Sequence, residues 1–195
     1  VDILQHIQQH YKRDNNMTDY TNIFVPCSGS PFRTGETVEK IVGGAIECFE
    51  QINGQDLVVH PLFLDPKGCN NDGSDKRWAV VDKLLRRKSY KKSIYCNENG
   101  LMECCPNMAM IITRSEGNRP IHGDICITLT TNTYNKHFKG RLPYYKTFED
   151  YQEARCELAE LDEQAQEAGF ENHRDLVLRE YGEDSEQAKK YCFYK

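Results

Sequence analysis

The chain has 195 residues, of which 30 are acidic, 25 are basic and 38% are hydrophobic, and its formal net charge is −5 at pH 7. This length is typical of one domain and can bury a core without a metal or a disulfide staple. The apolar runs are too short to cross a membrane, so no membrane association is expected. Nine cysteines without regular spacing favour free thiols in a reducing, cytoplasmic compartment. We expect no metal and no cofactor.

The predicted elements of the first half alternate between helices and strands. The clearest is a helix over residues 35–52, in which apolar side chains recur at steps of three and four. Thr34 is a suitable N-cap for it, with Thr37 close behind. Residues 65–75 are dense in turn formers and predict a surface loop. The other elements expected here are a helix over 2–13, strands over 22–26 and 56–64, and a helix over 76–87.

The second half begins with a short strand predicted over residues 93–96. Residues 108–114 and 124–131 then alternate between apolar and polar side chains, which favours an antiparallel hairpin joined by residues 115–123. Three helices are expected after it, over 147–168, 172–181 and 185–191.

This order of elements favours an α/β (or α+β) fold. We expect a mixed β-sheet of about five strands, with an N-terminal β-α-β unit, an antiparallel hairpin and a helical C-terminal region. The charge divides the chain in the same way. Residues 147–195 carry 14 acidic and 6 basic side chains, or −8, so the other 146 residues carry 16 and 19, or +3. We therefore predict a core domain over 1–146 and an acidic helical region over 147–195 that packs on it.

One segment carries a pattern typical of anion binding. The small-residue loop from Cys27 to Thr34 stands between a predicted strand and a predicted helix. Such a loop leaves backbone N–H groups free at the helix start, where they bind phosphate. The side chains and glycine expected to contact a phosphate are Ser28, Gly29, Ser30, Arg33 and Thr34.

Within this loop, Cys27, Arg33 and Thr34 match the C-x5-R-[S/T] signature, and the segment resembles the cysteine-dependent phosphatases, in particular their low-molecular-weight branch. The resemblance implies Cys27 as nucleophile, Arg33 as phosphate clamp and Thr34 as activator of the leaving thiolate. It also calls for a carboxylic acid that protonates the leaving group, and Asp65 is the candidate.

A second resemblance concerns the three residues Gly29-Ser30-Pro31. They are similar to the first loop of flavodoxin-like FMN reductases, but Phe32 intervenes before Arg33, and the later flavin loop of that family is absent.

Two basic stretches carry aromatic residues between their cations, which is typical of segments that follow a nucleic-acid backbone. The first stretch runs over residues 83–92, includes Tyr90 and contains Lys83, Arg86, Arg87, Lys88, Lys91 and Lys92. The second runs over residues 136–146 and contains Lys136, Lys139, Arg141 and Lys146. The acidic residues of 149–167 offer a contact for a basic partner.

These patterns lead to two hypotheses. In the first, the protein binds a phosphorylated small molecule or nucleotide at Cys27–Thr34. If it is an enzyme, it is a phosphoester hydrolase with Cys27 as nucleophile, or another nucleotide-handling enzyme. In the second, it is a non-catalytic module that contacts a protein or nucleic acid through its basic stretches (83–92 and 136–146) and its acidic face (149–167).

Overall fold

The computed structural model of the protein describes residues 19–49, 56–67 and 75–191. The helix expected over residues 2–13 and most of the predicted loop at 65–75 lie outside these ranges.

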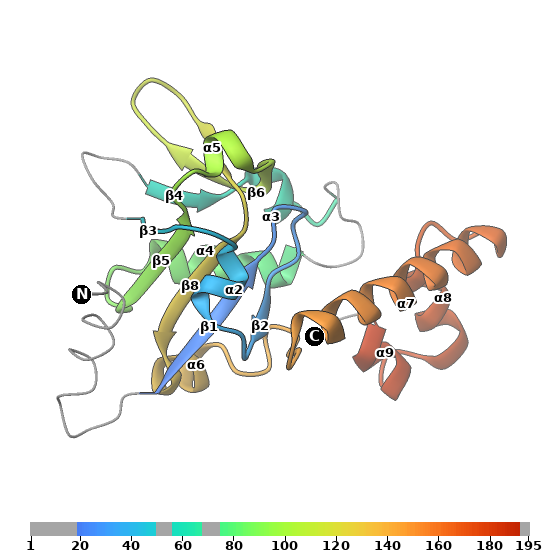
Figure 1. The fold of residues 1–195 in the computed structure, drawn as a ribbon. Coiled ribbons are helices and arrows are strands. Elements are labelled where there is room, and N and C mark those ends of the chain that lie inside the picture. The colour runs from blue at the N-terminus through green and yellow to red at the C-terminus, as the bar shows by residue number, and fades with distance from the viewer. Residues whose placement is uncertain (1–18, 50–55, 68–74, 192–195) are drawn as a thin grey trace.

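Two antiparallel sheets organise the described part (Figure 1). The larger has the strand order β2-β1-β8-β5-β3, and the smaller β4-β6-β7. The strands are β1 (Tyr20–Val25), β2 (Phe32–Thr34), β3 (Ile46–Cys48), β4 (Asp56–Val59), β5 (Lys92–Asn97), β6 (Pro106–Thr113), β7 (Arg119–His122) and β8 (Ile125–Thr130).

Alternation along the central strands gives the larger sheet two apolar faces. In β1, Ile23 and Val25 point into the main core, whereas Phe24 points to the opposite face. In β8, Ile127 and Cys126 divide in the same way. Because both faces of the sheet are apolar, each needs its own helical cover.

The main core is closed by helix α4 (Asp75–Arg86) and helix α6 (Thr131–His137). Trp78, Val81 and Leu84 lie one helical turn apart on α4 and are fully buried. Strands of the smaller sheet contribute Leu57 and Met110 to the same core, so both sheets share one interior. Two helices of four residues, α3 (Pro61–Leu64) and α5 (Gly100–Glu103), flank the smaller sheet.

The opposite face is covered by helix α2 (Val38–Val42) and by the start of helix α7 (Phe148–Glu167). Tyr151 of α7 stacks on Phe32, with ring centroids 4.2 Å apart. The helix begins where predicted because Thr147 and Asp150 form a capping box, each side chain accepting the other residue's backbone N–H.

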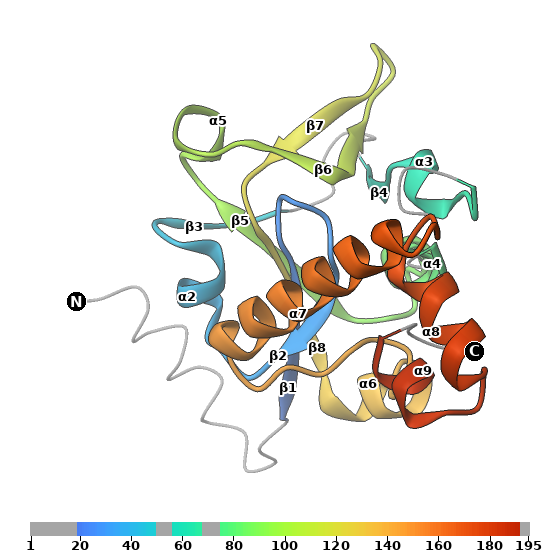
Figure 2. The same ribbon diagram turned by 90° about the vertical axis from the view of Figure 1, so that its right-hand side faces the viewer.

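Beyond its first turns α7 leaves the sheet, and helices α8 (His173–Tyr181) and α9 (Glu186–Tyr191) fold back onto it. These three helices project to one side of the body (Figures 1 and 2). His173 joins them, because its Nδ1 lies 2.6 Å from Asp162 Oδ1 on α7 and its Nε2 lies 3.0 Å from the carbonyl oxygen of Tyr191 on α9.

The α+β class, the five-stranded sheet and the helical C-terminal region are confirmed. The helix expected over residues 35–52 is wrong in length, since α2 ends after five residues. Gly43 and Gly44 adopt positive φ angles of 65° and 125°, which stops the helix. The chain then becomes β3, an edge strand paired with β5. The expected N-cap Thr34 lies in β2, and Thr37 caps the helix.

Two strand pairings also differ from prediction. Residues 106–113 pair with β4 and β7, while β8 pairs with β1 and β5, so the predicted hairpin does not form. The linker 115–123 contains a strand of its own. The expected mixed sheet is antiparallel, and no parallel β-α-β unit forms in the described residues. A five-residue helix is too short for the crossover that parallel strands need.

Among the described helices, none combines the length and the apolar character that a bilayer crossing demands. Seven cysteines fall within the described residues, and all seven are free thiols.

Candidate functional site

The predicted phosphate loop lies in a turn between two strands. Residues Cys27 to Pro31 connect β1 to β2, and the register pairs Phe24 with Phe32 and Ile23 with Arg33. Helix α2 begins only at Val38. The expected order of strand, loop and helix is therefore corrected: an extra strand separates Cys27 from the helix, whose first N–H groups do not belong to this loop.

Three backbone N–H groups in and beside the turn are bound within the protein. The N–H of Cys27 donates to Asp124 Oδ1 at 2.8 Å, and that of Gly29 donates to the Pro26 carbonyl at 2.9 Å. The N–H of Arg33 donates to the Pro143 carbonyl at 3.2 Å. Donors already bound in this way do not form a free anion cradle.

Arg33, the predicted phosphate clamp, is held by two aromatic rings. Its guanidinium carbon lies 4.9 Å from the ring centroid of Tyr134 and 4.9 Å from that of Tyr144. Such contacts stabilise a cation by its attraction to the ring faces. The guanidinium is thus packed between α6 and the segment that follows it, whereas the Cys27 thiol lies at the turn beside Asp124.

The environment of Cys27 opposes thiolate formation. Burial raises the pKa of its thiol, and the charge and hydrogen bond of Asp124 raise it further. A thiol that attacks phosphate needs the reverse, a pKa lowered by nearby positive charge. Phosphate binding and hydrolysis at this turn stay predictions, and the geometry favours structural roles for the groups that carried them.

The other predicted phosphate ligands have neighbours of their own. Ser28 accepts a hydrogen bond from Arg155 of α7 at 3.0 Å. Gly29 has φ of 78°, and a side chain there would approach the Phe63 ring to 2.9 Å, so the space beside it is filled.

Thr34 accepts the Glu36 N–H at 3.1 Å, and Ser30 is partly exposed in the turn. Asp65, the candidate acid, is exposed and accepts the N–H of Lys67.

The structure brings the two basic stretches together. Tyr90, in the loop between α4 and β5, lies 5.0 Å from the ring of His137 and 5.5 Å from that of Phe138 at the end of α6. Segments 83–92 and 131–141 contain nine lysines and arginines and no acidic residue. Here they are called the basic end, whose cations are Lys83, Arg86, Arg87, Lys88, Lys91, Lys92, Lys136, Lys139 and Arg141.

Most cations of the basic end are exposed. Arg86 forms an ion pair with Asp82, one helical turn earlier, at 2.7 Å. Its positive charge is therefore partly compensated, and the neighbouring cations contribute more to the charge of the surface. Lys92 is partly buried and donates to the Arg87 carbonyl at 3.2 Å, and this burial lowers the pKa of its ammonium. Its role is to hold the loop that presents Arg87, Lys88 and Lys91.

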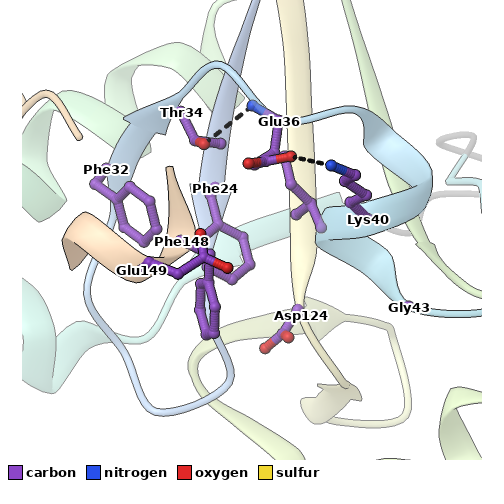
Figure 3. Close-up of a pocket in the computed structure, with 10 residues that line it drawn as sticks. Phe24, Phe32, Thr34, Glu36, Lys40, Gly43, Asp124, Phe148 and Glu149 are labelled. Atoms are coloured by element: carbon purple, nitrogen blue, oxygen red, sulfur yellow. Dashed lines mark hydrogen bonds and ion pairs between the residues drawn. The ribbon is translucent and has the colours of Figure 1, made fainter. Parts of the chain in front are cut away.

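A separate pocket lies on the face of the larger sheet that α2 and α7 cover, and its volume is about 390 Å³. Figure 3 shows phenylalanine rings between the Glu36–Lys40 ion pair at one end and Asp124 at the other. The lining residues come from β1, β2, α2, α7 and the segments beside them: Phe24, Phe32, Thr34, Glu36, Lys40, Ile41, Gly43, Asp124, Phe148 and Glu149.

No sequence motif marks this pocket, although Thr34 belongs to it. Its walls come from residues more than 100 positions apart, such as Phe24 and Phe148, and only the docking of α7 brings them together. The one available signal was Phe24 between two residues that face the main core, since strict alternation points it to a second covered face.

Comparison of the chain with protein-family models, with curated proteins and with solved structures finds no match. Within the described ranges, no group of three or more histidine, cysteine and acidic side chains is placed to hold a metal ion.

Proposed function

We propose that the protein is a non-catalytic binding module whose basic end contacts the phosphate backbone of a nucleic acid. The observation that carries this proposal is the contact of Tyr90 with His137, at 5.0 Å between ring centroids. It joins two basic segments that lie far apart in the sequence into one surface.

The chemistry of this surface fits a polyanion. Exposed lysine and arginine side chains are long and flexible, so their charged ends can reach phosphates at varied positions. Each such contact releases a counterion from the nucleic acid. Tyr90 and His137 stand among them, each partly exposed, and a base can stack on the part of a ring that is left open. A flexible single strand suits this surface best, because its phosphates can follow an irregular row of cations.

The overall charge of −5 does not oppose this role, because the charges are separated. Of the 14 acidic residues between 147 and 195, eight lie on α7, and that helix leaves the body on the side away from α6 (Figure 1). A phosphate backbone at the basic end therefore meets mostly positive charge within the screening length of about 10 Å.

The test is fluorescence anisotropy with a labelled single-stranded RNA of about 20 nucleotides, at salt concentrations between about 50 and 200 mM. The triple variant Arg87→Gln, Lys88→Gln, Lys91→Gln should weaken binding about tenfold or more. It should also reduce the slope of log affinity against log salt by about 2 to 3.

A matched control removes three exposed cations elsewhere, Lys67→Gln, Arg119→Gln and Lys189→Gln, with the same change in net charge. It should bind nearly as well as the unchanged protein. Equal loss in both variants, or no binding by the unchanged protein, would refute the proposal. Displacement of the RNA by polyglutamate at an equal charge concentration would instead indicate an acidic protein partner.

A further inference from the structure

The pocket between α2 and α7 combines an apolar floor with acidic walls. Phe24, Phe32 and Ile41 form the floor and are at most 7% exposed. Phe148 stands at the rim, 41% exposed, and its ring centroid lies 6.0 Å from that of Phe24. The volume of about 390 Å³ is within the range of small-molecule sites.

The charges at this pocket do not cancel. Lys40 forms an ion pair with Glu36 at 3.1 Å, and this pair is neutral as a unit. Asp124 and Glu149 remain, and no described lysine or arginine forms an ion pair with either of them. Asp124 accepts the Cys27 N–H through Oδ1 and is also hydrogen-bonded to the Cys27 thiol, and neither of these neutral donors compensates its charge.

From this combination we propose that the pocket binds a small organic cation, an ammonium group carried on an aromatic or aliphatic body. Ring faces attract a cation through their electron density, and two carboxylates add direct charge attraction. The apolar body of such a ligand covers the phenylalanine floor. An anion meets two uncompensated carboxylates, and a purely apolar ligand leaves them without a partner.

This inference concerns a site away from the basic end and does not rest on nucleic-acid binding. The probes are 2-phenylethylammonium, 2-phenylethanol and phenylacetate, which share one aromatic body and differ in charge. Binding is followed by NMR titration of the ¹⁵N-labelled protein. The backbone amides of Phe24, Ile41 and Phe148 should shift with the cation.

The affinity should fall in the order cation, neutral compound, anion, with about tenfold between the first and the last. Asp124→Asn keeps an acceptor for the Cys27 N–H and removes the charge, so it should weaken cation binding about fivefold. Glu149→Gln changes an exposed residue and should weaken it severalfold, which keeps the test valid where the first variant does not fold.

The control Glu160→Gln removes an exposed acid on the same helix, outside the pocket, and should leave the affinity unchanged. Three results would overturn the proposal: equal affinity for cation and anion, amide shifts outside the pocket only, or equal losses in Glu149→Gln and Glu160→Gln.

Discussion

The turn between β1 and β2 and the basic end both combine cationic and aromatic residues, with opposite consequences. Arg33, next to the turn between β1 and β2, is held between Tyr134 and Tyr144, and the N–H groups of Cys27 and Gly29 are bound within the chain. At the basic end, Arg87, Lys88 and Lys91 lie in the same loop as Tyr90 and are exposed. The same residue types thus stabilise the fold in one region and remain available for a ligand in the other.

Substitutions in the two regions should have different effects. Changes in the turn should lower the free energy of unfolding and leave ligand binding intact. Changes at the basic end should weaken ligand binding and leave the free energy of unfolding nearly unchanged.

The largest effect is expected from Gly29→Ala. Its φ of 78° disfavours any side chain, and the added Cβ would lie 2.9 Å from the Phe63 ring. Backbone strain and overpacking together should lower the free energy of unfolding by about 2 to 4 kcal/mol. Urea denaturation measures the loss. Gly140→Ala is the control, because φ is 76° there and nothing lies within 4 Å, so it should lose only the part that comes from backbone strain.

The sharpest comparison pairs Arg33→Met with Arg87→Met. Both variants keep an unbranched apolar side chain and lose one positive charge. Arg33→Met removes two cation–π contacts and should cost about 1 to 2 kcal/mol of stability, with RNA affinity nearly unchanged. Arg87→Met should change stability by less than about 0.5 kcal/mol and weaken RNA binding. Urea denaturation and anisotropy are measured on both proteins, and the same pattern in both would contradict the comparison.

A smaller effect is expected from Arg155→Met on α7. This residue donates to Ser28 at 3.0 Å and lies over the Tyr151 ring at 5.9 Å, so it ties α7 to the turn. Its loss should cost about 0.5 to 1.5 kcal/mol and speed amide hydrogen exchange in the first turns of α7. Arg179→Met removes a similar contact to Phe170 within the C-terminal helices and should leave those amides unchanged.

The mildest test concerns the Cys27 thiol and pH. Burial and Asp124 raise its pKa above that of an ordinary thiol, so most of the thiol ionises only at alkaline pH. The rate of iodoacetamide alkylation at Cys27, followed by peptide mass spectrometry, should therefore rise only in that alkaline range, and neither phosphate nor vanadate should protect it.

Asp124→Asn should move the alkylation midpoint to lower pH, because it removes the negative charge that disfavours the thiolate. A midpoint near neutral pH in the unchanged protein, together with protection by vanadate, would instead restore Cys27 as an activated nucleophile and support the phosphatase hypothesis.

The local elements of the fold were predictable where capping and periodicity agree. Helix α4 carries one apolar stripe, and α7 starts at a capping box, so both were found within about two residues. Residues 35–52 were misassigned because their apolar spacing fits a helix, while the two glycines that stop it are tolerated in many helices at a modest cost. The pairing of β8 with β1 and β5 depends on partners distant in the sequence, which periodicity does not encode.

The candidate site was predictable only in its parts. Both basic stretches are visible in the sequence, but their union depends on the contact of Tyr90 with His137 across the fold. Arg33 packs against Tyr144 because an isolated β-bridge pairs the backbones of these two residues, which lie 111 positions apart in the sequence (144 − 33). Motif spacing alone therefore could not distinguish an arginine that binds a ligand from one that packs against tyrosines.

The placement of the acidic helices has an electrostatic consequence. Residues 148–191 carry 5 basic and 14 acidic side chains, or −9, and beyond the start of α7 their helices project away from the body (Figure 1). Segments 83–92 and 131–141 carry nine cations and no acidic residue. The molecule is therefore a permanent electric dipole. In the field of a polyanion it experiences a torque that turns the basic end forward before contact, so more of its random encounters become productive. Added salt should slow this association, although a net charge of −5 taken alone predicts the opposite.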